Sequence, residues 1–441
     1  MSSEHHQVLT PQIIPPSIPS YCEELGVPTS VIDSLILKFL AVYPKIDLVE
    51  LTQRLGVVSS LVECSLSLLK NRNFVQVFKP HDDGQTSSYS HLRYSLTELG
   101  ALEAEHALNK DPYVGAVPVS IEDYWRVVQQ QDVREAPITR TDIERALSEV
   151  YGSEALIPVL GPAINSGRAL LLYGHAGTGK SYVASKVLNA MNTSVFIPYG
   201  VYVDGRIIKV FSQHHHQRVS TPHSNMLIKL KANYDQRWVL CERPNIQVGG
   251  ELTMSMLEVQ CSKSNPVWTA PLQMMANNGI LVVDDLGRQP MPVESLLNRW
   301  IVPMEYQVDH LSLPNGQQLS IPFVLTLAFS SNLAPSEIAD PAFLRRLGYK
   351  IEFHPLQQQD YKALWLSLAS REKLTLPPEL FERLYQLHRE FETAYLPCLA
   401  KDLLGICRDI LVFESKSNLI LPDILQRAWE LYFTETRSEG A

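Results

Sequence analysis

The sequence predicts an α/β fold: a mainly parallel sheet with helices on both faces, a smaller α+β domain before it and a helical domain after it. Three observations lead to this prediction. Between residues 141 and 356, short apolar runs typical of buried strands alternate with helical patterns. From residue 357 onward the pattern is helical almost throughout. At 441 residues the chain is too long for one compact core, so several domains are expected.

The composition is that of an ordinary globular protein, with 45% hydrophobic and 19% charged residues. No apolar run reaches the roughly 18–20 residues that a membrane helix needs. The first residues, MSSEHHQVLTPQ, lack the basic and apolar regions of a secretory signal. The six cysteines are scattered without a Cys-x-x-Cys pair, which favours reduced thiols. We therefore expect a cytoplasmic protein without membrane insertion.

The N-terminal region is predicted to be a flexible arm over residues 1–28, followed by a winged-helix-like domain over residues 29–110. The arm is rich in proline and polar residues. VIDSLILKFLAVY and DLVELTQRLGVVSSLVECSLSLLKNR have helical spacing, with a tight turn at Gly56. FVQVF and YSHLRYSL alternate as the strands of a hairpin do, and TELGALEAEHAL adds a closing helix. Three helices followed by a hairpin is the order of a winged helix.

The charge of this region bears on what it binds. The whole chain has a formal net charge of −9, and residues 1–110 hold 12 Asp and Glu against 8 Lys and Arg. Nucleic acid is bound largely through neutralised phosphates. The second helix of the pair, about Ser59–Asn71, carries Glu63 and has Lys70 only at its end. The sequence favours docking of a protein or dimerisation, and DNA binding stays an alternative.

Residues 111–140 are predicted to form a linker and a helix. DPYVGAVPVS has the proline and glycine content of a linker, and IEDYWRVVQQQ has helical spacing. The next helix lies in TRTDIERALSEV and is predicted to begin with a capping box formed by Thr141 and Glu144. The α/β domain is expected over residues 141–356 and the helical domain over residues 357–441.

The segment GHAGTGKS matches the phosphate-loop pattern G-x-x-x-x-G-K-[ST] without a gap. ALLLY before it is typical of a buried strand, and SYVASKVLNA after it begins a helix whose dipole favours an anion. In this pattern backbone amides turn toward the phosphates, the lysine contacts the β- and γ-phosphate oxygens, and the serine binds Mg²⁺. The predicted nucleotide-binding residues are Gly174, His175, Ala176, Gly177, Thr178, Gly179, Lys180 and Ser181.

Further candidate residues follow at the ends of two later strands. GILVVDDLG delivers two carboxylates: Asp284 is predicted to hold Mg²⁺ together with Ser181, and Asp285 to orient or deprotonate an attacking water. The strand VLTLAFSSN ends in Asn332, whose amide is suited to positioning the same water. DPAFLRRLGYKI then places two adjacent arginines, Arg345 and Arg346, in an apolar setting before a further strand.

The order of these motifs along the chain resembles that of the AAA+ ATPases. It runs from the phosphate loop through the two aspartates, the strand that ends in Asn332 and the arginine pair to the helical C-terminal region. The resemblance covers about Thr141–Glu435. It implies ATP hydrolysis with ATP and Mg²⁺ as cofactors, Asn332 as the sensor 1 residue, and a homo-oligomer such as a hexameric ring. It also implies that Arg346, or else Arg345, contacts the γ-phosphate of a neighbouring subunit as an arginine finger, which contributes about 10³–10⁵-fold in related reactions.

Two positions depart from the family pattern. Where the family has its sensor 2 arginine the chain has Lys401, a cation without the planar guanidinium that binds a phosphate through two hydrogen bonds. Arg408 lies seven residues further on and is the alternative. The second acid of the strand is Asp285, whereas most of the family has Glu there, so slow hydrolysis is open.

Two features resemble the MoxR-type, helix-2-insert branch of the family. Asp284 follows Lys180 by 104 positions, more than a minimal core needs. VDHLSLPNGQQLSIPF is typical of a hairpin around Asn315-Gly316, directly before the strand that ends in Asn332. GGELT, DDLGRQ and LLNRWIVP are similar to bacterial ATPases that are labelled as having chaperone activity.

The predicted function is therefore Mg-dependent ATP hydrolysis by an oligomeric ATPase that remodels or chaperones a protein partner recruited by the N-terminal domain. Two alternatives stay open: a DnaA- or helicase-loader-like ATPase that binds nucleic acid, and a regulatory switch that binds ATP and hydrolyses it slowly. For PYGVY, residues 198–202, strand tyrosines are favoured over a pore loop. For His214–His216 with His223, an ordinary loop is favoured over a metal site.

Overall fold

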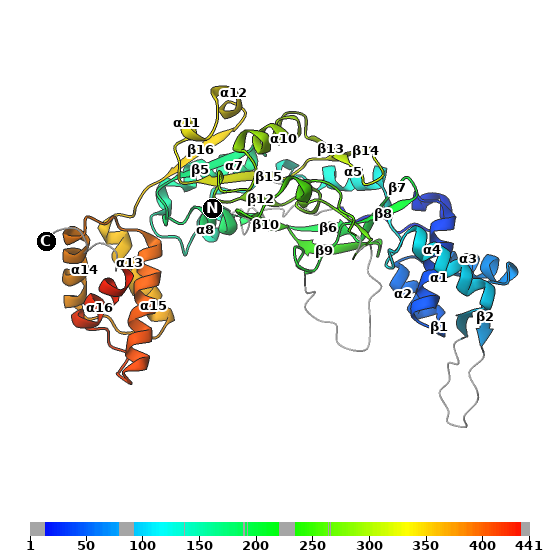
Figure 1. Cartoon of the computed structure of the whole chain (residues 1–441), viewed down its shortest axis with the longest axis horizontal. Coiled ribbons are helices and arrows are strands. Elements are labelled where there is room, and N and C mark those ends of the chain that lie inside the picture. The colour runs from blue at the N-terminus through cyan, green and yellow to red at the C-terminus, as the bar shows by residue number, and fades with distance from the viewer. Residues whose placement is uncertain are drawn as a thin grey trace, which may run out of the picture. The chain divides into compact units, whose positions relative to one another are not determined.

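The computed structural model describes residues 14–78, 92–135, 137–187, 190–191, 193–219, 234–262, 264 and 266–433. Most of its helices and strands are labelled in Figure 1. Contacts divide the chain into two units. Unit 1 contains Met1–Pro137, Asn192–Leu281 and Pro290–Thr326, and unit 2 contains Ile138–Met191, Val282–Gln289 and Leu327–Ala441. The division into domains at residues 28, 110, 140 and 356 stays a prediction.

The N-terminal part of unit 1 has the predicted element order of three helices, two paired strands and a closing helix. The elements are η1 (Cys22–Leu25), α1 (Thr29–Val42), β1 (Ile46–Asp47), α2 (Leu48–Leu55), α3 (Ser59–Asn71), β2 (Val75–Phe78), β3 (Arg93–Leu96) and α4 (Glu98–Lys110). β3 pairs antiparallel with both β1 and β2. The predicted turn HDDGQTSS lies outside the described residues.

Close packing fixes α4 against the end of α3. A Cβ at Gly100 would collide with the carbonyl of Phe74, so only glycine allows α4 to approach this backbone. Thr97 begins the helix, because its Oγ1 accepts a hydrogen bond of 3.0 Å from the amide of Gly100. Asp47 begins α2 in the same way, with its Oδ1 2.8 Å from the amide of Glu50.

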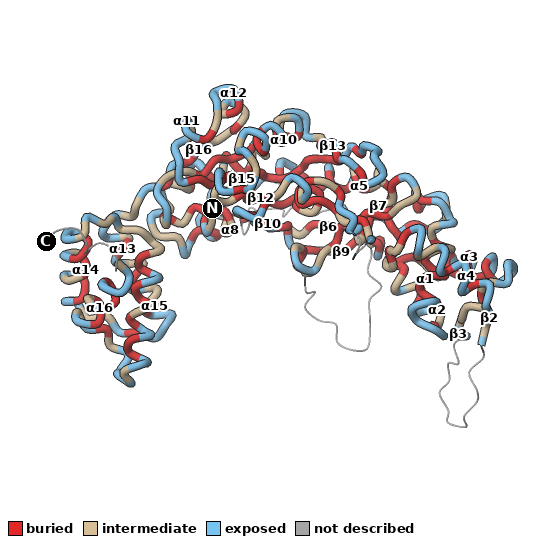
Figure 2. The backbone as a smooth tube through the Cα atoms, in the orientation of Figure 1, coloured by how far each residue is buried: buried red, intermediate tan, exposed pale blue. Residues whose placement is uncertain are grey.

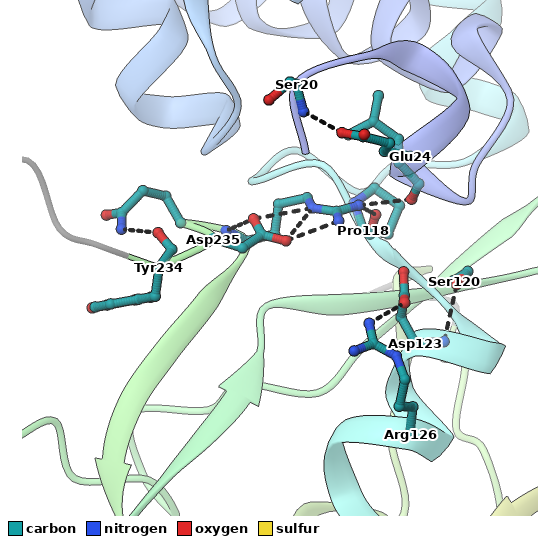
Figure 3. A network of polar contacts seen from close by, with 11 residues as sticks. Ser20, Glu24, Pro118, Ser120, Asp123, Arg126, Tyr234 and Asp235 are labelled. Atoms are coloured by element: carbon teal, nitrogen blue, oxygen red, sulfur yellow. Dashed lines mark hydrogen bonds and ion pairs between the residues drawn. The ribbon is translucent and has the colours of Figure 1, made fainter. Parts of the chain in front are cut away.

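Residues 14–28 lie against unit 1, where the sequence predicts a loose arm. Leu25 is fully buried, and the amide of Asp235 donates to the carbonyl of Pro16 at 3.0 Å. Arg237 pairs with Asp235 at 2.8 Å and donates to the carbonyl of Leu25 at 2.9 Å. Figure 3 shows this network. The buried ion pair therefore connects the N-terminal segment to the start of β9 (Trp238–Glu242).

The predicted linker, residues 111–120, also packs against the N-terminal helices. The amide of Val117 donates to the carbonyl of Leu55 at 2.8 Å, and Tyr113 and Val117 are both buried. β4 (Val119–Ser120) pairs in parallel with β7 (Gly200–Val203). α5 (Ile121–Gln130) then begins at Ser120, whose Oγ accepts from the amide of Asp123 at 3.1 Å.

The rest of unit 1 is rich in short strands. They are β6 (Ser194–Pro198), β8 (Arg206–Lys209), β10 (Asn245–Val248), β11 (Trp268–Thr269), β13 (Val308–Ser312) and β14 (Gln318–Pro322), with helical segments η2 (Val133–Glu135), η5 (Met254–Leu257), α9 (Leu272–Met275) and α10 (Val293–Tyr306). β11, β8, β7 and β4 form one sheet, and β6 pairs with β9. β13 and β14 pair antiparallel around Asn315-Gly316, which confirms the predicted hairpin.

Five strands form the sheet that carries the candidate site, in the order β10, β12 (Ile280–Val283), β15 (Thr326–Ser331), β5 (Leu170–Gly174) and β16 (Tyr349–Phe353). β5 pairs in parallel with both β15 and β16. The helical segments of this region are α6 (Arg140–Ala146), η3 (Ser153–Ala155), α7 (Ile157–Asn165), α8 (Lys180–Val187), α11 (Pro335–Ile338) and α12 (Pro341–Leu344). The predicted fold class, a parallel α/β sheet that carries a phosphate loop, is confirmed.

The predicted capping box is wrong by two residues. α6 begins at Arg140, and the box is formed by Thr139 and Asp142. The amide of Asp142 donates to Thr139 Oγ1 at 3.3 Å, and the amide of Thr139 donates to Asp142 Oδ2 at 2.9 Å. Glu144 instead pairs with Arg140 at 2.8 Å.

The C-terminal part of unit 2 is helical, as predicted. Its helices are α13 (Gln358–Arg371), α14 (Pro378–Glu390), α15 (Pro397–Phe413) and α16 (Pro422–Tyr432). Their apolar residues form a core that contains Trp365 and Trp429. In Figure 2 buried residues, in red, lie along each of these helices. None of the helices among the described residues has the length and apolar character that crossing a bilayer requires.

Candidate nucleotide-binding site

The phosphate loop connects β5 to α8, as the sequence predicts. Gly174, Gly177 and Gly179 have positive φ angles of 124°, 77° and 90°, a region that favours glycine. At Gly174 a Cβ would also collide with the backbone of Phe353. Thr178 Oγ1 donates to the carbonyl of His175 at 2.8 Å and closes the turn. The backbone of the loop is therefore shaped to turn its amides toward an anion at the start of α8.

Lys180 lies at the centre of the site and is 6% exposed. Its ammonium donates to the carbonyls of Gly174 and His175, both at 2.9 Å, and to Oδ1 of Asn332 at 2.8 Å. Burial lowers the pKa of Lys180, and the charges of Asp284 and Asp285 oppose this shift. All three hydrogen-bond acceptors are uncharged, so the ammonium is positioned to exchange them for phosphate oxygens, to which its bonds are stronger.

The acidic pair follows β12 directly. Asp285 has a left-handed φ of 48°, which is uncommon outside Gly, Asn and Asp. Its amide donates to Oδ1 of Asp284 at 3.1 Å. Its own Oδ1 accepts a long hydrogen bond of 3.5 Å from Nδ2 of Asn332. Asn332 thus contacts both Lys180 and Asp285. Three predicted site residues are brought together, one from the start of α8 and two from the ends of strands.

Gln289, for which sequence patterns indicate no role, helps to hold the turn after the acidic pair. The residue is buried. Its Nε2 donates to the carbonyl of Asp284 at 3.0 Å and to that of Asp285 at 3.4 Å, and its Oε1 accepts from the amide of Gly287 at 2.9 Å. A buried amide that bonds to three backbone groups fixes the path of this turn. In the sequence, Gln289 stands in the polar segment DDLGRQ, and this context does not indicate that its side chain is buried.

The arginine pair lies between α12 and β16. Arg345 is exposed and Arg346 is half-buried. Arg346 Nη1 donates to the carbonyl of Ala342 at 2.9 Å. The role of the two arginines in a neighbouring site stays a prediction.

The helical C-terminal part contacts the phosphate loop through the start of α15. The amide of Cys398 donates to the carbonyl of Gly177 at 3.3 Å, and a Cβ at Gly177 would collide with Sγ of Cys398. Burial raises the pKa of the Cys398 thiol. Lys401 lies one turn further along α15 and is exposed. Arg408, the alternative to Lys401, pairs with Glu372 at 2.8 Å, so its guanidinium already has a carboxylate partner.

The candidate magnesium ligands are the hydroxyl of Ser181 and the carboxylate of Asp284. Oxygen ligands of this kind suit Mg²⁺, which keeps several waters and takes few ligands from the protein. The residues present therefore fit this ion. Among the described residues, no group of three or more His, Cys, Asp or Glu side chains is arranged to hold a metal.

The histidine run has a structural role at His216. Its Nδ1 accepts from the amide of Ser212 at 3.0 Å, and its Nε2 lies 2.9 Å from the carbonyl of Met275. Burial lowers the pKa of His216 to about 4. The ring is thus a buried neutral group of unit 1. His223 lies outside the described residues.

Comparison with known proteins characterises one part of the chain. Residues 357–431, which span α13–α16, match a family described as Domain of unknown function (DUF8689). No curated protein matches the chain.

Solved structures that resemble the chain include RuvB from Thermotoga maritima, titled a Holliday junction branch migration motor. Its identity is 14% over 69% of this chain and 73% of that chain, with a TM-score of 0.35. NtrX from Brucella abortus is 12% identical over 62% of this chain and 52% of that chain, with a TM-score of 0.40. At these TM-scores the likeness supports no inference about this chain.

Proposed function

We propose that this chain is a Mg-dependent ATPase of the AAA+ class. The observation that carries the proposal is the hydrogen-bonded contact of Lys180, Asn332 and Asp285 at the start of α8. A lysine of a phosphate loop, a strand-end amide and a strand-end carboxylate are the groups that phosphoryl transfer to water requires. The order of motifs along the sequence supports the same class.

The residues divide the chemistry among them. The amides of the loop and the ammonium of Lys180 bind and orient the phosphates. Ser181 and Asp284 would hold a magnesium ion, which would neutralise charge on the transferred group. Asp285 and Asn332 orient the attacking water, and Asp285 accepts its proton. Lys401 is placed on the first turns of α15 to sense the nucleotide through the helical domain. Catalysis is by positioning and electrostatics.

We further propose that the active form is a homo-oligomer, such as a hexameric ring, in which Arg346 or Arg345 completes the neighbour's site. ATPase rate per subunit, measured against protein concentration, tests this. The wild-type rate should climb with concentration, and Arg346→Ala should lower it by about 10³-fold or more. Arg345→Ala is compared in the same way, and Arg389→Ala, an exposed arginine of α14, is the matched control.

A flat and very low rate that neither arginine affects would contradict the motor. Such a result would favour the regulatory switch. The aspartate at position 285 and its long hydrogen bond to Asn332 support that alternative. Retention of ADP or ATP through purification would then be expected.

For the biological role we propose remodelling of a protein partner, in the manner of the MoxR-type branch, in the cytoplasm. The exposed face of α3 supports a protein rather than DNA, because it presents Glu63, Cys64 and Leu68, and Lys70 is the one cation of the helix. A gel shift with duplex DNA separates the two. Micromolar binding with a steep salt dependence would instead favour the nucleic-acid alternative.

A further inference from the structure

A separate cavity lies in the N-terminal part of unit 1 and is not used by the proposed hydrolysis. Its volume is about 270 Å³. Its walls come from α1, from the ends of α3 and α4, from Tyr202 of β7 and from Gly205 of the turn between β7 and β8. The ionisable residues that line it include Asp33, Lys38, Arg72, Glu103, Lys110 and Asp111. A cavity with this many charged groups is built for a polar occupant rather than an apolar one.

Lys38 is the buried cation of this cavity. The residue is 2% exposed. Its ammonium donates one hydrogen bond, of 3.3 Å, to the carbonyl of Tyr113, although an ammonium carries three donors. Among the described residues it forms no ion pair. A buried ammonium with one long hydrogen bond is costly, and an anion that enters the cavity removes that cost.

The charges around Lys38 favour an anion. Arg206 and Lys110 repel its ammonium, and Asp111 alone attracts it. The carboxylate of Asp111 is in addition engaged by the amide of Tyr113 at 3.1 Å. Two of the three charges that act on the Lys38 ammonium are therefore positive. Elsewhere in the cavity the charge of Asp33 is opposed by Arg72.

We propose that this cavity binds a small metabolite that carries a carboxylate or a phosphate, with the ammonium of Lys38 as its anchor. Its volume of about 270 Å³ suits a small organic acid, because pockets for drug-sized ligands begin at roughly 300 Å³. The ligand contacts α1, α4 and the β7–β8 turn together, and so joins the N-terminal helices to the strands of unit 1.

Thermal unfolding of the full chain tests the site, with inorganic phosphate and succinate as probes at ionic strength matched by NaCl. A ligand that binds only the folded state raises the midpoint. We expect a rise of about 2 °C or more with at least one probe, and a titration that is at least tenfold weaker in Lys38→Met. Methionine fills the same space without charge. Lys70→Met, an exposed change on α3, should behave as wild type.

Phosphate can also bind the phosphate loop, so the same titrations are repeated in Lys180→Ala. The Lys38-dependent rise should persist there. A rise of the unfolding midpoint with succinate alone assigns the ligand to the carboxylates, and a rise with phosphate alone assigns it to the phosphates. Should Lys38→Met fail to fold, Ala107→Leu fills the cavity and should weaken the titration equally. No rise with either probe, or an equal rise in the Lys38 and Ala107 variants, overturns the proposal.

Discussion

The side chain of Gln289 makes several of the hydrogen bonds that hold the turn after β12. Asp285 has a left-handed backbone, which is uncommon for a residue other than glycine, and Gly287 has a φ of 109°. Gln289 bonds to the carbonyls before and after this backbone and to the amide of Gly287. The direction in which the two carboxylates leave the strand therefore depends in part on Gln289, whose side chain bonds to the backbone around them.

Gln289→Ala should reduce activity by about 10–100-fold, which is the usual cost of losing a group that orients metal ligands. The physical reason is that the turn relaxes and the carboxylates of Asp284 and Asp285 lose their positions. The Mg²⁺ concentration for half-maximal ATPase rate should rise, while binding of nucleotide without metal changes little. Gln289→Glu should not restore the rate, because a carboxylate cannot donate to the two carbonyls. The exposed Gln129→Ala is the control, and an unchanged Mg²⁺ requirement in Gln289→Ala would refute this role.

His216 is a buried residue whose protonation opposes folding. Burial lowers the pKa of His216 from 6.5 to about 4, so the folded chain keeps the ring neutral where the unfolded chain binds a proton. Its contribution to stability is complete above pH 6.5 and is lost as the pH falls from 6.5 toward 4. Between pH 7 and pH 5 this loss amounts to about 2 kcal/mol.

In His216→Gln the free energy of unfolding should therefore fall less between pH 7 and pH 5 than it does in wild type. Urea unfolding at both values measures the difference, and the exposed His354→Gln is the matched control. Equal pH dependence in wild type and His216→Gln would show that another group is responsible for the acid sensitivity.

Two glycines in helices illustrate how packing decides the effect of one added methyl group. In α4, a Cβ at Gly100 meets the backbone of Phe74, whereas in α15 a Cβ at Gly405 meets nothing within 4 Å. Gly405→Ala should stabilise the protein by about 0.5–1 kcal/mol, because glycine costs a helix interior backbone entropy. Gly100→Ala should destabilise it by about 1–3 kcal/mol, since the backbone must shift.

Thermal unfolding of both variants against wild type checks the pair, and each serves as the other's control. A neutral Gly100→Ala would mean that α4 does not approach Phe74 as closely as it does here.

At the scale of elements, sequence patterns predicted the kind of element well and its contacts poorly. The phosphate loop, the β13–β14 hairpin and the strand that ends in Asn332 carry signals within one segment, namely glycines with a required φ, an Asn-Gly turn and an apolar run. The capping box was displaced because Thr139 and Thr141 both precede an acid by three residues, and only the helix start at Arg140 distinguishes them.

The roles of Gln289, Arg408 and the segment before α1 depend on partners far away in the sequence. Arg408 stays the alternative to Lys401, and its ion pair with Glu372 joins residues 36 positions apart. The proline-rich composition of residues 14–28 predicts an arm. Asp235 and Arg237, which bond to the backbone of this segment, lie more than 200 positions further along the chain, so its own sequence does not indicate them. Local sequence patterns do not indicate contacts between residues that are far apart in the sequence.

At the scale of the whole molecule, the four C-terminal helices have the properties of an independent module. The apolar core of α13–α16 draws all of its buried members from residues 361–429, and the family match covers almost the same span. The amide of Leu356 donates to the carbonyl of Tyr395 at 2.9 Å, which closes the module at its first residues. A single core of this size is enough for folding in many domains of about 60 residues or more.

A fragment of residues 355–433 should therefore fold alone, with a helical circular dichroism spectrum and a cooperative thermal transition. Within it, Leu384→Ala should cost about 2–5 kcal/mol, because Leu384 is fully buried. Leu366→Ala, at a residue that is 47% exposed, should cost much less. A fragment without a cooperative transition, or one in which the two leucines are equivalent, would mean that this core is completed by the rest of the chain.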